Sequence, residues 1–88
     1  MPKVIIAHGV ADIDRWLAGK AGRVELIGAV GSNVTDHVAA DGSNQVAVSV
    51  DVQDVSAVQA MLASPPAEVA AAMQAHGVLP PFTVYVEK

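Results

Sequence analysis

Hydrophobic and polar residues alternate most strictly between residues 45 and 52. Four valines, at positions 46, 48, 50 and 52, are separated by Gln45, Ala47, Ser49 and Asp51. A period of two residues is typical of a β-strand that has one apolar face and one mixed face. Three more segments rich in β-branched residues predict strands at about 3–10, 33–40 and 82–87, and a turn is predicted at 41–44, between the strands at 33–40 and 45–52.

A helical pattern fills the segment between the first two predicted strands. Asp12 is placed to cap a helix, because its carboxylate can accept hydrogen bonds from free backbone N–H groups. Apolar residues then recur at helical spacing, and the pattern predicts one helix that ends near Gly28. Gly19 and Gly22 each weaken this helix by about 1 kcal/mol relative to alanine. A loop over 28–32 follows.

A second helical segment, interrupted by prolines, precedes the last strand. Asp54 is expected to cap its first part, and Ser64-Pro65-Pro66 ends that part and begins another helix at 66–76. Gly77 stands where a glycine commonly ends a helix. Pro80-Pro81 excludes further helix before the final strand.

The predicted order of elements is βαββαβ, which indicates a ferredoxin-like α+β sandwich formed by a single domain of residues 1–88. Its four-stranded antiparallel sheet would carry helices on one face only. Ala47 and Ser49 make the other face smooth, and Thr83 and Tyr85 keep it partly polar. We expect a second copy of the chain to cover that face, so that two sheets pair into a dimeric α/β barrel.

Composition narrows the functional classes. Hydrophobic residues make up 52%, so the chain is not disordered, and alanine and valine contribute 16 residues each. A net charge of −4 with 5 basic residues argues against nucleic acid as a partner. The sequence has no cysteine and no apolar run long enough to span a membrane, and its first residues lack a signal-peptide cleavage site. We therefore expect a cytoplasmic protein with no membrane contact.

The chain resembles the dimeric α/β-barrel superfamily, near the antibiotic-biosynthesis-monooxygenase-like branch. The similar segments are Asp14-Arg15-Trp16, the strand at 45–51 with Asp54-Val55 after it, 61–66 leading into Val69 and Met73, and 77–81. The resemblance implies a range of activities that includes cofactor-free monooxygenases, polyketide cyclases, lactone isomerases and haem-degrading enzymes. Haem-degrading members pair an asparagine on the first strand with a tryptophan and a histidine. The first strand here has no asparagine, which argues against haem degradation.

Five side chains are candidates for one pocket between sheet and helices. His8 alternates with two apolar residues of the first strand, and Asp36 with two valines of the second. His76 follows Met73 on the inner stripe of the last helix, and Trp16 lies on that of the first. A histidine, His8 or His76, would act as general acid or base, with Asp36 holding its tautomer. Trp16 and Met73 would form an apolar wall for a flat ligand.

Each candidate also has a purely structural interpretation. His8 can be a hydrogen-bonded residue at a strand end, and His76 a cation that stabilises a helix C-terminus. Asp36 can face solvent on an edge strand, because a register error of one residue reverses the face. Trp16 can simply belong to the core.

Two further residues, His37 and Tyr85, are expected on the mixed face of the sheet. His37 would line the space between two subunits or lie on an exposed rim. Tyr85 would be an aromatic contact in the dimer or a phenol donor into a cavity. Asp36 and His37 are neighbours whose side chains point apart on a strand, and no histidine spacing typical of a metal site is present. We expect no metal and no cofactor.

Two functional hypotheses remain open at this stage. In the first, the protein is a homodimer that binds an apolar, aromatic or polyketide-like small molecule. It would be a cofactor-independent monooxygenase, or a cyclase or isomerase that uses histidine acid/base chemistry. In the second, the dimer is a non-catalytic interaction or stress-response module. Whether the protein is an enzyme depends on the pocket, because a fold alone does not determine function.

Overall fold

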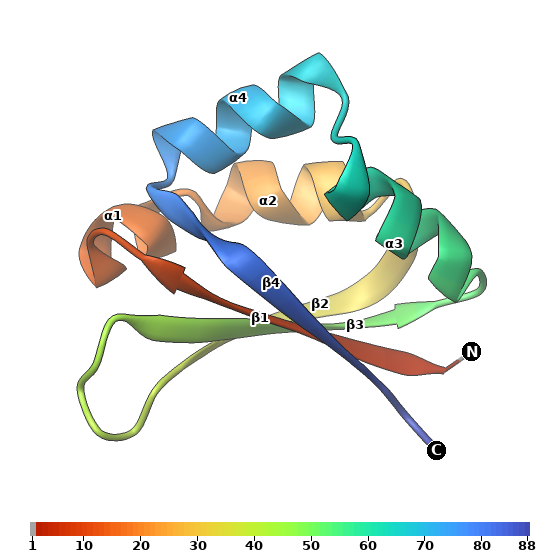
Figure 1. The fold of residues 1–88 in the computed structure, drawn as a ribbon, viewed down its shortest axis with the longest axis horizontal. Coiled ribbons are helices and arrows are strands. Elements are labelled where there is room, and N and C mark those ends of the chain that lie inside the picture. The colour runs from red at the N-terminus through yellow and green to blue at the C-terminus, as the bar shows by residue number, and fades with distance from the viewer. Residues whose placement is uncertain (1) are drawn as a thin grey trace.

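A computed structural model describes residues 2–88. Four strands and four helices follow one another along the chain. They are β1 (Lys3–Val10), α1 (Ile13–Ala18), α2 (Lys20–Ile27), β2 (Gly31–Val38), β3 (Gln45–Val52), α3 (Val55–Ala63), α4 (Ala67–Ala75) and β4 (Val78–Val86). The strands form one sheet in the order β2-β3-β1-β4, and all neighbours are antiparallel. All helices lie on one face of this sheet, so the ferredoxin-like sandwich is confirmed (Figure 1).

Valines at alternate positions of β1 and β3 form the floor of the core. Val4 pairs with Val50 and Ile6 with Val48 across the two central strands. These four side chains are at most 5% exposed. The face predicted from the period of two is therefore the face that the helices cover, and its burial supplies the hydrophobic stabilisation that holds the two layers together.

The expectation of one continuous helix after β1 is wrong. The helix is interrupted at Gly19, which ends α1 and precedes the first residue of α2. A Cβ atom at Gly19 would lie 2.4 Å from ring atoms of His76, so any larger residue would have to displace that ring. The break turns the chain around this contact.

The capping residues take the positions that the sequence predicts. The Asp12 carboxylate accepts a hydrogen bond from the Arg15 amide at 3.2 Å, and Asp54 accepts one from the Ser56 amide at 3.0 Å. Gly77 follows α4 with φ = 72°, a conformation that favours glycine.

The side chain of Arg15 ties the first helical segment to the last. Its Nε donates to the carbonyl of Ala75 and its Nη2 to that of Gln74, both at 2.7 Å. The Ala75 carbonyl gains a partner in this way, and the Gln74 carbonyl, which also accepts from the Gly77 amide, gains a second one.

Strand β2 begins and ends two residues earlier than expected. It contains an irregularity between Ser32 and Thr35, where its pairing with β3 shifts register. Asn33 lies within this shift and has φ = 56°, a conformation that asparagine adopts more readily than most residues. The extra residue restores the alternation that places Asp36 on the helix-covered face.

Strand β4 begins at Val78, four residues before the expected start. The cis peptide bond Pro80-Pro81 lies within it, where the pairing with β1 shifts register between Ala7 and Gly9. Prolines are accommodated at such irregularities and on edge strands, because no ladder hydrogen bond needs their missing N–H.

Among the residues that the structure describes, no helix covers the second face of the sheet (Figure 1). Ile5 of β1 pairs with Tyr85 of β4 on this face, and their side chains are 38% and 57% exposed. Within residues 2–88, every helix is too short or too polar to cross a lipid bilayer.

Candidate functional site

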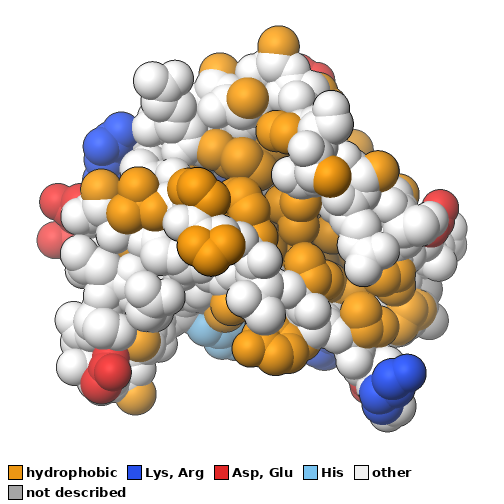
Figure 2. All heavy atoms as spheres, in the orientation of Figure 1, with side chains coloured by type: hydrophobic (Ala, Val, Ile, Leu, Met, Phe, Trp, Pro, Cys, Tyr) orange, Lys and Arg blue, Asp and Glu red, His pale blue; other side chains and the backbone are white. Residues whose placement is uncertain are grey.

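A pocket lies between the sheet and the helices. Its walls are mostly apolar and come from all parts of the chain: Ile6, His8, Trp16, Arg23, Leu26, Ile27, Val48, Met61, Leu62, Val69, Ala72, Met73, His76, Val78 and Phe82. The cavity has a volume of about 80 Å³, and the free space reaches about 590 Å³ when the open mouth is included. Figure 2 shows hydrophobic side chains gathered in a hollow on the face that carries β4, α3 and α4.

His8 is buried in the wall of this pocket, as the sequence predicts for the inner face of β1. Its ring packs edge-on against Trp16, with centroids 6.0 Å apart, and against Phe82 at 5.4 Å. The Nδ1–H group donates to the carbonyl of Gly9 at 2.8 Å. Burial lowers the pKa of His8, and the nearby positive charge of Arg23 lowers it further. The ring is therefore neutral at pH 7 and its Nε2 carries a free lone pair.

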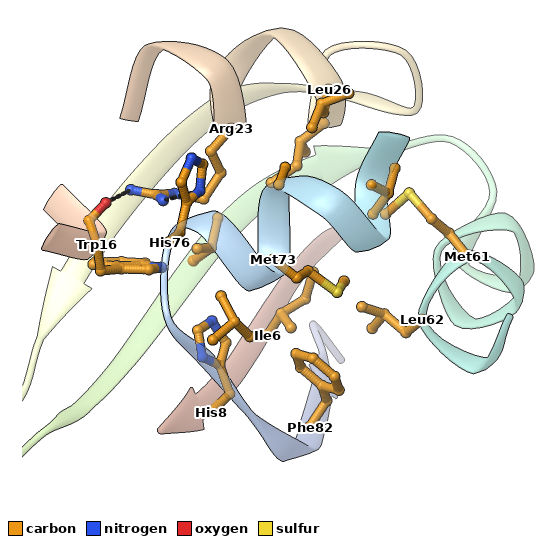
Figure 3. A pocket seen from close by; sticks show the side chains of 15 residues that line it. Ile6, His8, Trp16, Arg23, Leu26, Met61, Leu62, Met73, His76 and Phe82 are labelled. Atoms are coloured by element: carbon orange, nitrogen blue, oxygen red, sulfur yellow. Dashed lines mark hydrogen bonds between the residues drawn. The ribbon is translucent and has the colours of Figure 1, made fainter. Parts of the chain in front are cut away.

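Trp16 forms another part of the wall and is completely buried. Its indole Nε1–H has no hydrogen-bond acceptor among the residues described. In Figure 3 the indole nitrogen lies at the end of the ring that points toward the interior of the pocket. The guanidinium carbon of Arg23 lies 4.0 Å from the ring centroid, in a cation–π contact.

Arg23 is a central residue of the site that the sequence analysis did not identify. It forms a two-point ion pair with Asp36, with Nε 3.2 Å from Oδ1 and Nη2 2.7 Å from Oδ2. Nη2 also donates to the carbonyl of Trp16 at 3.0 Å. The two charged side chains are only 9% and 4% exposed, so this is a buried pair. Arg23 lies seven residues after Trp16, a helical spacing that already places it on the same inner stripe.

His76 reaches the pocket from the end of α4. Nη1 of Arg23 donates to its Nδ1 at 3.4 Å, so this nitrogen is an acceptor (Figure 3). Burial lowers the pKa of His76, and the charges of Arg23 and Arg15 lower it further. The ring of His76 also packs against Gly19, and as in His8 one ring nitrogen, Nδ1, is engaged in a hydrogen bond.

Asp36 does not hold the tautomer of a histidine, contrary to the hypothesis from the sequence. Its carboxylate is buried on the predicted face, but both oxygens bind Arg23. The tautomer of His8 is set by a backbone carbonyl and that of His76 by Arg23. Asp36 therefore positions Arg23, and it does not line the pocket.

The other candidate residues divide between the two faces of the sheet. Met73 lines the pocket beside His8 and Trp16. His37 and Tyr85 lie on the open face, where Nε2 of His37 is 3.0 Å from the hydroxyl of Ser49. These two residues face away from the pocket of their own chain. Within residues 2–88, His, Asp and Glu side chains nowhere gather in the groups of three that a metal ion would need.

The contact between Gly19 and His76 leads to a prediction with an internal control. Gly19→Ala is expected to lower the free energy of unfolding or displace the His76 ring, because the added Cβ overlaps that ring. Gly22→Ala, where a Cβ meets nothing within 4 Å, is expected to raise the free energy of unfolding by about 0.5–1 kcal/mol, because alanine has the higher helix propensity. Urea unfolding of both variants measures the difference. Stabilisation by Gly19→Ala equal to that by Gly22→Ala would contradict the contact.

Two lowered histidine pKa values make stability depend on pH. Below the ordinary histidine pKa of 6.5, the unfolded chain takes up protons at His8 and His76 more readily than the folded chain. The free energy of unfolding is therefore expected to be highest above pH 6.5 and to fall on acidification toward the folded pKa values. Urea unfolding between about pH 7.5 and about pH 5.5 covers this window. A double variant, His8→Gln with His76→Gln, should give a flatter profile, and an equally steep one would contradict the assignment.

The sheet order, the helices on one face and the pocket between the two layers define a ferredoxin-like α+β sandwich. No protein-family model matches the sequence, and no curated protein matches it. Solved structures do share the fold. One is provisionally named an antibiotic biosynthesis monooxygenase from Bordetella bronchiseptica, with a TM-score of 0.72 and 17% identity over 99% of this chain and 94% of that one.

Two more solved structures with the same fold carry the same kind of name. An antibiotic biosynthesis monooxygenase is similar with a TM-score of 0.66 and 17% identity, over 100% of this chain and 97% of that one. A protein from Nitrosomonas europaea, provisionally given that name, has a TM-score of 0.59 and 15% identity over the same shares of the two chains. The resemblance recognised in the sequence is thus matched at the level of the fold.

Proposed function

We propose that this protein binds an aromatic small molecule in the pocket and catalyses its cofactor-independent oxygenation, with His8 as the base. The observation that carries the proposal is a neutral, buried histidine in a mostly apolar pocket. Since Nδ1 of His8 is bound to Gly9, Nε2 is free to accept a proton from a ligand. The names of proteins with the same fold support an oxygenation reaction.

The proposed reaction uses molecular oxygen as the co-reactant. His8 Nε2 removes the hydroxyl proton of an electron-rich phenol, and the resulting anion transfers electrons to O₂. With 1-naphthol as an example, the ring C–H para to the hydroxyl becomes a carbonyl and 1,4-naphthoquinone forms. One oxygen atom of O₂ enters the product and the other leaves as water, so that one naphthol and one O₂ give one quinone and one water. The apolar wall excludes bulk water and keeps the base neutral.

The first experiment uses 1-naphthol as the probe. NMR spectra should show shifts of the methyl groups of Ile6, Leu62 and Met73, all of which line the pocket, and oxygen uptake should accompany quinone formation. Binding without oxygen uptake would favour the alternative, a non-catalytic binding module. Absence of any shift at saturating 1-naphthol would refute the pocket as a ligand site.

Filling the pocket gives a matched pair of variants on α4. Ala72 lines the cavity, whereas its neighbour Ala71 is exposed. Ala72→Phe is expected to weaken 1-naphthol binding at least about 10-fold, a loss of roughly 1.4 kcal/mol, because the phenyl ring occupies the site. Ala71→Phe should bind as the unmodified protein does. Equal binding by both variants in the NMR titration would place the ligand elsewhere.

We propose in addition that a second copy of the chain covers the open face of the sheet. Ile5 and Tyr85 expose apolar surface there, and the small Ala47 and Ser49 beside them leave a smooth surface for another sheet. Light scattering coupled to size exclusion should give twice the mass of 9.0 kDa at micromolar concentration. A mass of one chain would refute the dimer.

A further inference from the structure

The indole N–H of Trp16 is a polar group without a partner in an apolar pocket. The residue is fully buried, and no described side chain or carbonyl accepts a hydrogen bond from Nε1. A buried donor that stays unpaired costs free energy, about 1–3 kcal/mol in typical cases. Trp16 Nε1–H is therefore poised to donate to whatever enters the pocket with an acceptor atom.

The surroundings of Trp16 leave few alternative partners for such an atom. Four of the five N–H groups of Arg23 are engaged in hydrogen bonds, to Asp36, the Trp16 carbonyl and His76. His8 Nε2 is an acceptor in the neutral ring. His8 thus offers a free acceptor, and Trp16 is the donor next to it, because their rings are in edge-to-face contact with centroids 6.0 Å apart. The Nε2–H group of His76 is a further donor in the wall.

Arg23 strengthens Trp16 as a donor. Its guanidinium carbon lies 4.0 Å from the indole centroid, and the positive charge draws π-electron density away from the N–H bond. The same charge favours an anionic oxygen near the ring, because the site is shielded from water. A neutral hydrocarbon gains nothing from either effect.

We infer that Trp16 Nε1–H binds the oxygen of the ligand and so selects oxygen-bearing aromatic compounds over hydrocarbons of the same shape. This inference rests on the proposed function of the pocket. A hydroxyl oxygen would accept from Trp16 while its proton faces His8 Nε2. After proton transfer, the charged oxygen stays bound to the indole. Trp16 is then a specificity-determining residue, and His8 is the base.

The test compares 1-naphthol with 1-methylnaphthalene, in which a methyl group replaces the hydroxyl. The chain has a single tryptophan, so its indole N–H gives one identifiable signal in a ¹H–¹⁵N spectrum. We expect the indole proton to move downfield when 1-naphthol binds and to move much less with 1-methylnaphthalene, which produces only ring-current effects. A Trp16→Phe variant should lose the preference for 1-naphthol by about 3- to 10-fold, the value of one hydrogen bond.

Each outcome of this comparison is informative. If both probes shift the methyl groups of Ile6 and Met73 but the indole proton responds equally to both, the role of Trp16 is overturned while the binding pocket stands. If neither probe shifts those methyl groups, the proposed function fails and the inference fails with it. The measurement on the unmodified protein needs no variant, so a Trp16→Phe chain that does not fold would not prevent a decision.

Discussion

Replacement of Arg23 by methionine is expected to lower the free energy of unfolding by about 3–5 kcal/mol. The change leaves the carboxylate of Asp36 buried, at 4% exposure, without its cation. It also removes the hydrogen bond to the Trp16 carbonyl and the cation–π contact with the indole. Since domains of this size are stable by about 5–15 kcal/mol, such a loss approaches complete unfolding.

Urea unfolding followed by circular dichroism measures this loss, and Lys20→Met supplies the control. Lys20 is an exposed basic residue on the same helix, so its replacement should change stability by less than about 0.5 kcal/mol. A double variant, Arg23→Met with Asp36→Leu, should recover much of the loss, because it removes both charges together. If Arg23→Met lowers the free energy of unfolding no more than Lys20→Met does, the ion pair between Arg23 and Asp36 does not hold α2 against β2.

Replacement of His8 by glutamine is expected to reduce oxygenation of 1-naphthol by about 100-fold or more, while 1-naphthol still binds. Glutamine has a similar size but no basic nitrogen, so the pocket keeps its shape and loses its proton acceptor. The rate in the unmodified protein should rise with pH through the lowered pKa of His8 and level off by neutral pH. Oxygen uptake and NMR titration separate the rate from the affinity.

Two other histidines are the controls for this variant. His37→Gln, on the open face of the sheet, should leave the oxygenation rate unchanged. His76→Gln should have a smaller effect than His8→Gln, because Nδ1 of His76 accepts from Arg23 and the proton of the neutral ring is then on Nε2, so this ring has no free lone pair to act as a base. If His76→Gln lowered the oxygenation rate as much as His8→Gln, the assignment of His8 as the base would be contradicted.

The valine alternation in 45–52 was sufficient to predict β3 and its apolar face, and the alternation of His8 with Val4 and Ile6 placed His8 on the apolar face of β1. That success has a physical basis, since a period of two has only one interpretation when one face is buried. The break at Gly19 was not predicted, and the contact of this glycine with the ring of His76, 57 residues further along the chain, is one that the local sequence does not reveal. Helix propensity indicates that the helix is weak near its glycines, but it does not show at which glycine the helix breaks.

Arg23 was missed for a different reason. Because charged residues are rarely buried, the histidines, Asp36 and the aromatic residues stand out in the sequence as candidates for chemistry, whereas Arg23 does not. The spacing of seven residues from Trp16 and four from Ile27 was a signal for an inward-facing position. What the spacing could not provide was the partner, because Asp36 reaches Arg23 only once the irregularity near Asn33 has restored the alternation of β2.

The burial of the sole tryptophan has a practical consequence. Its indole lies under a guanidinium and against an imidazole, in the wall that any guest of the cavity must touch. The fluorescence of Trp16 therefore reports on the wall of the pocket. The emission wavelength and intensity should change both when a ligand enters the pocket and when the domain unfolds, without any attached dye.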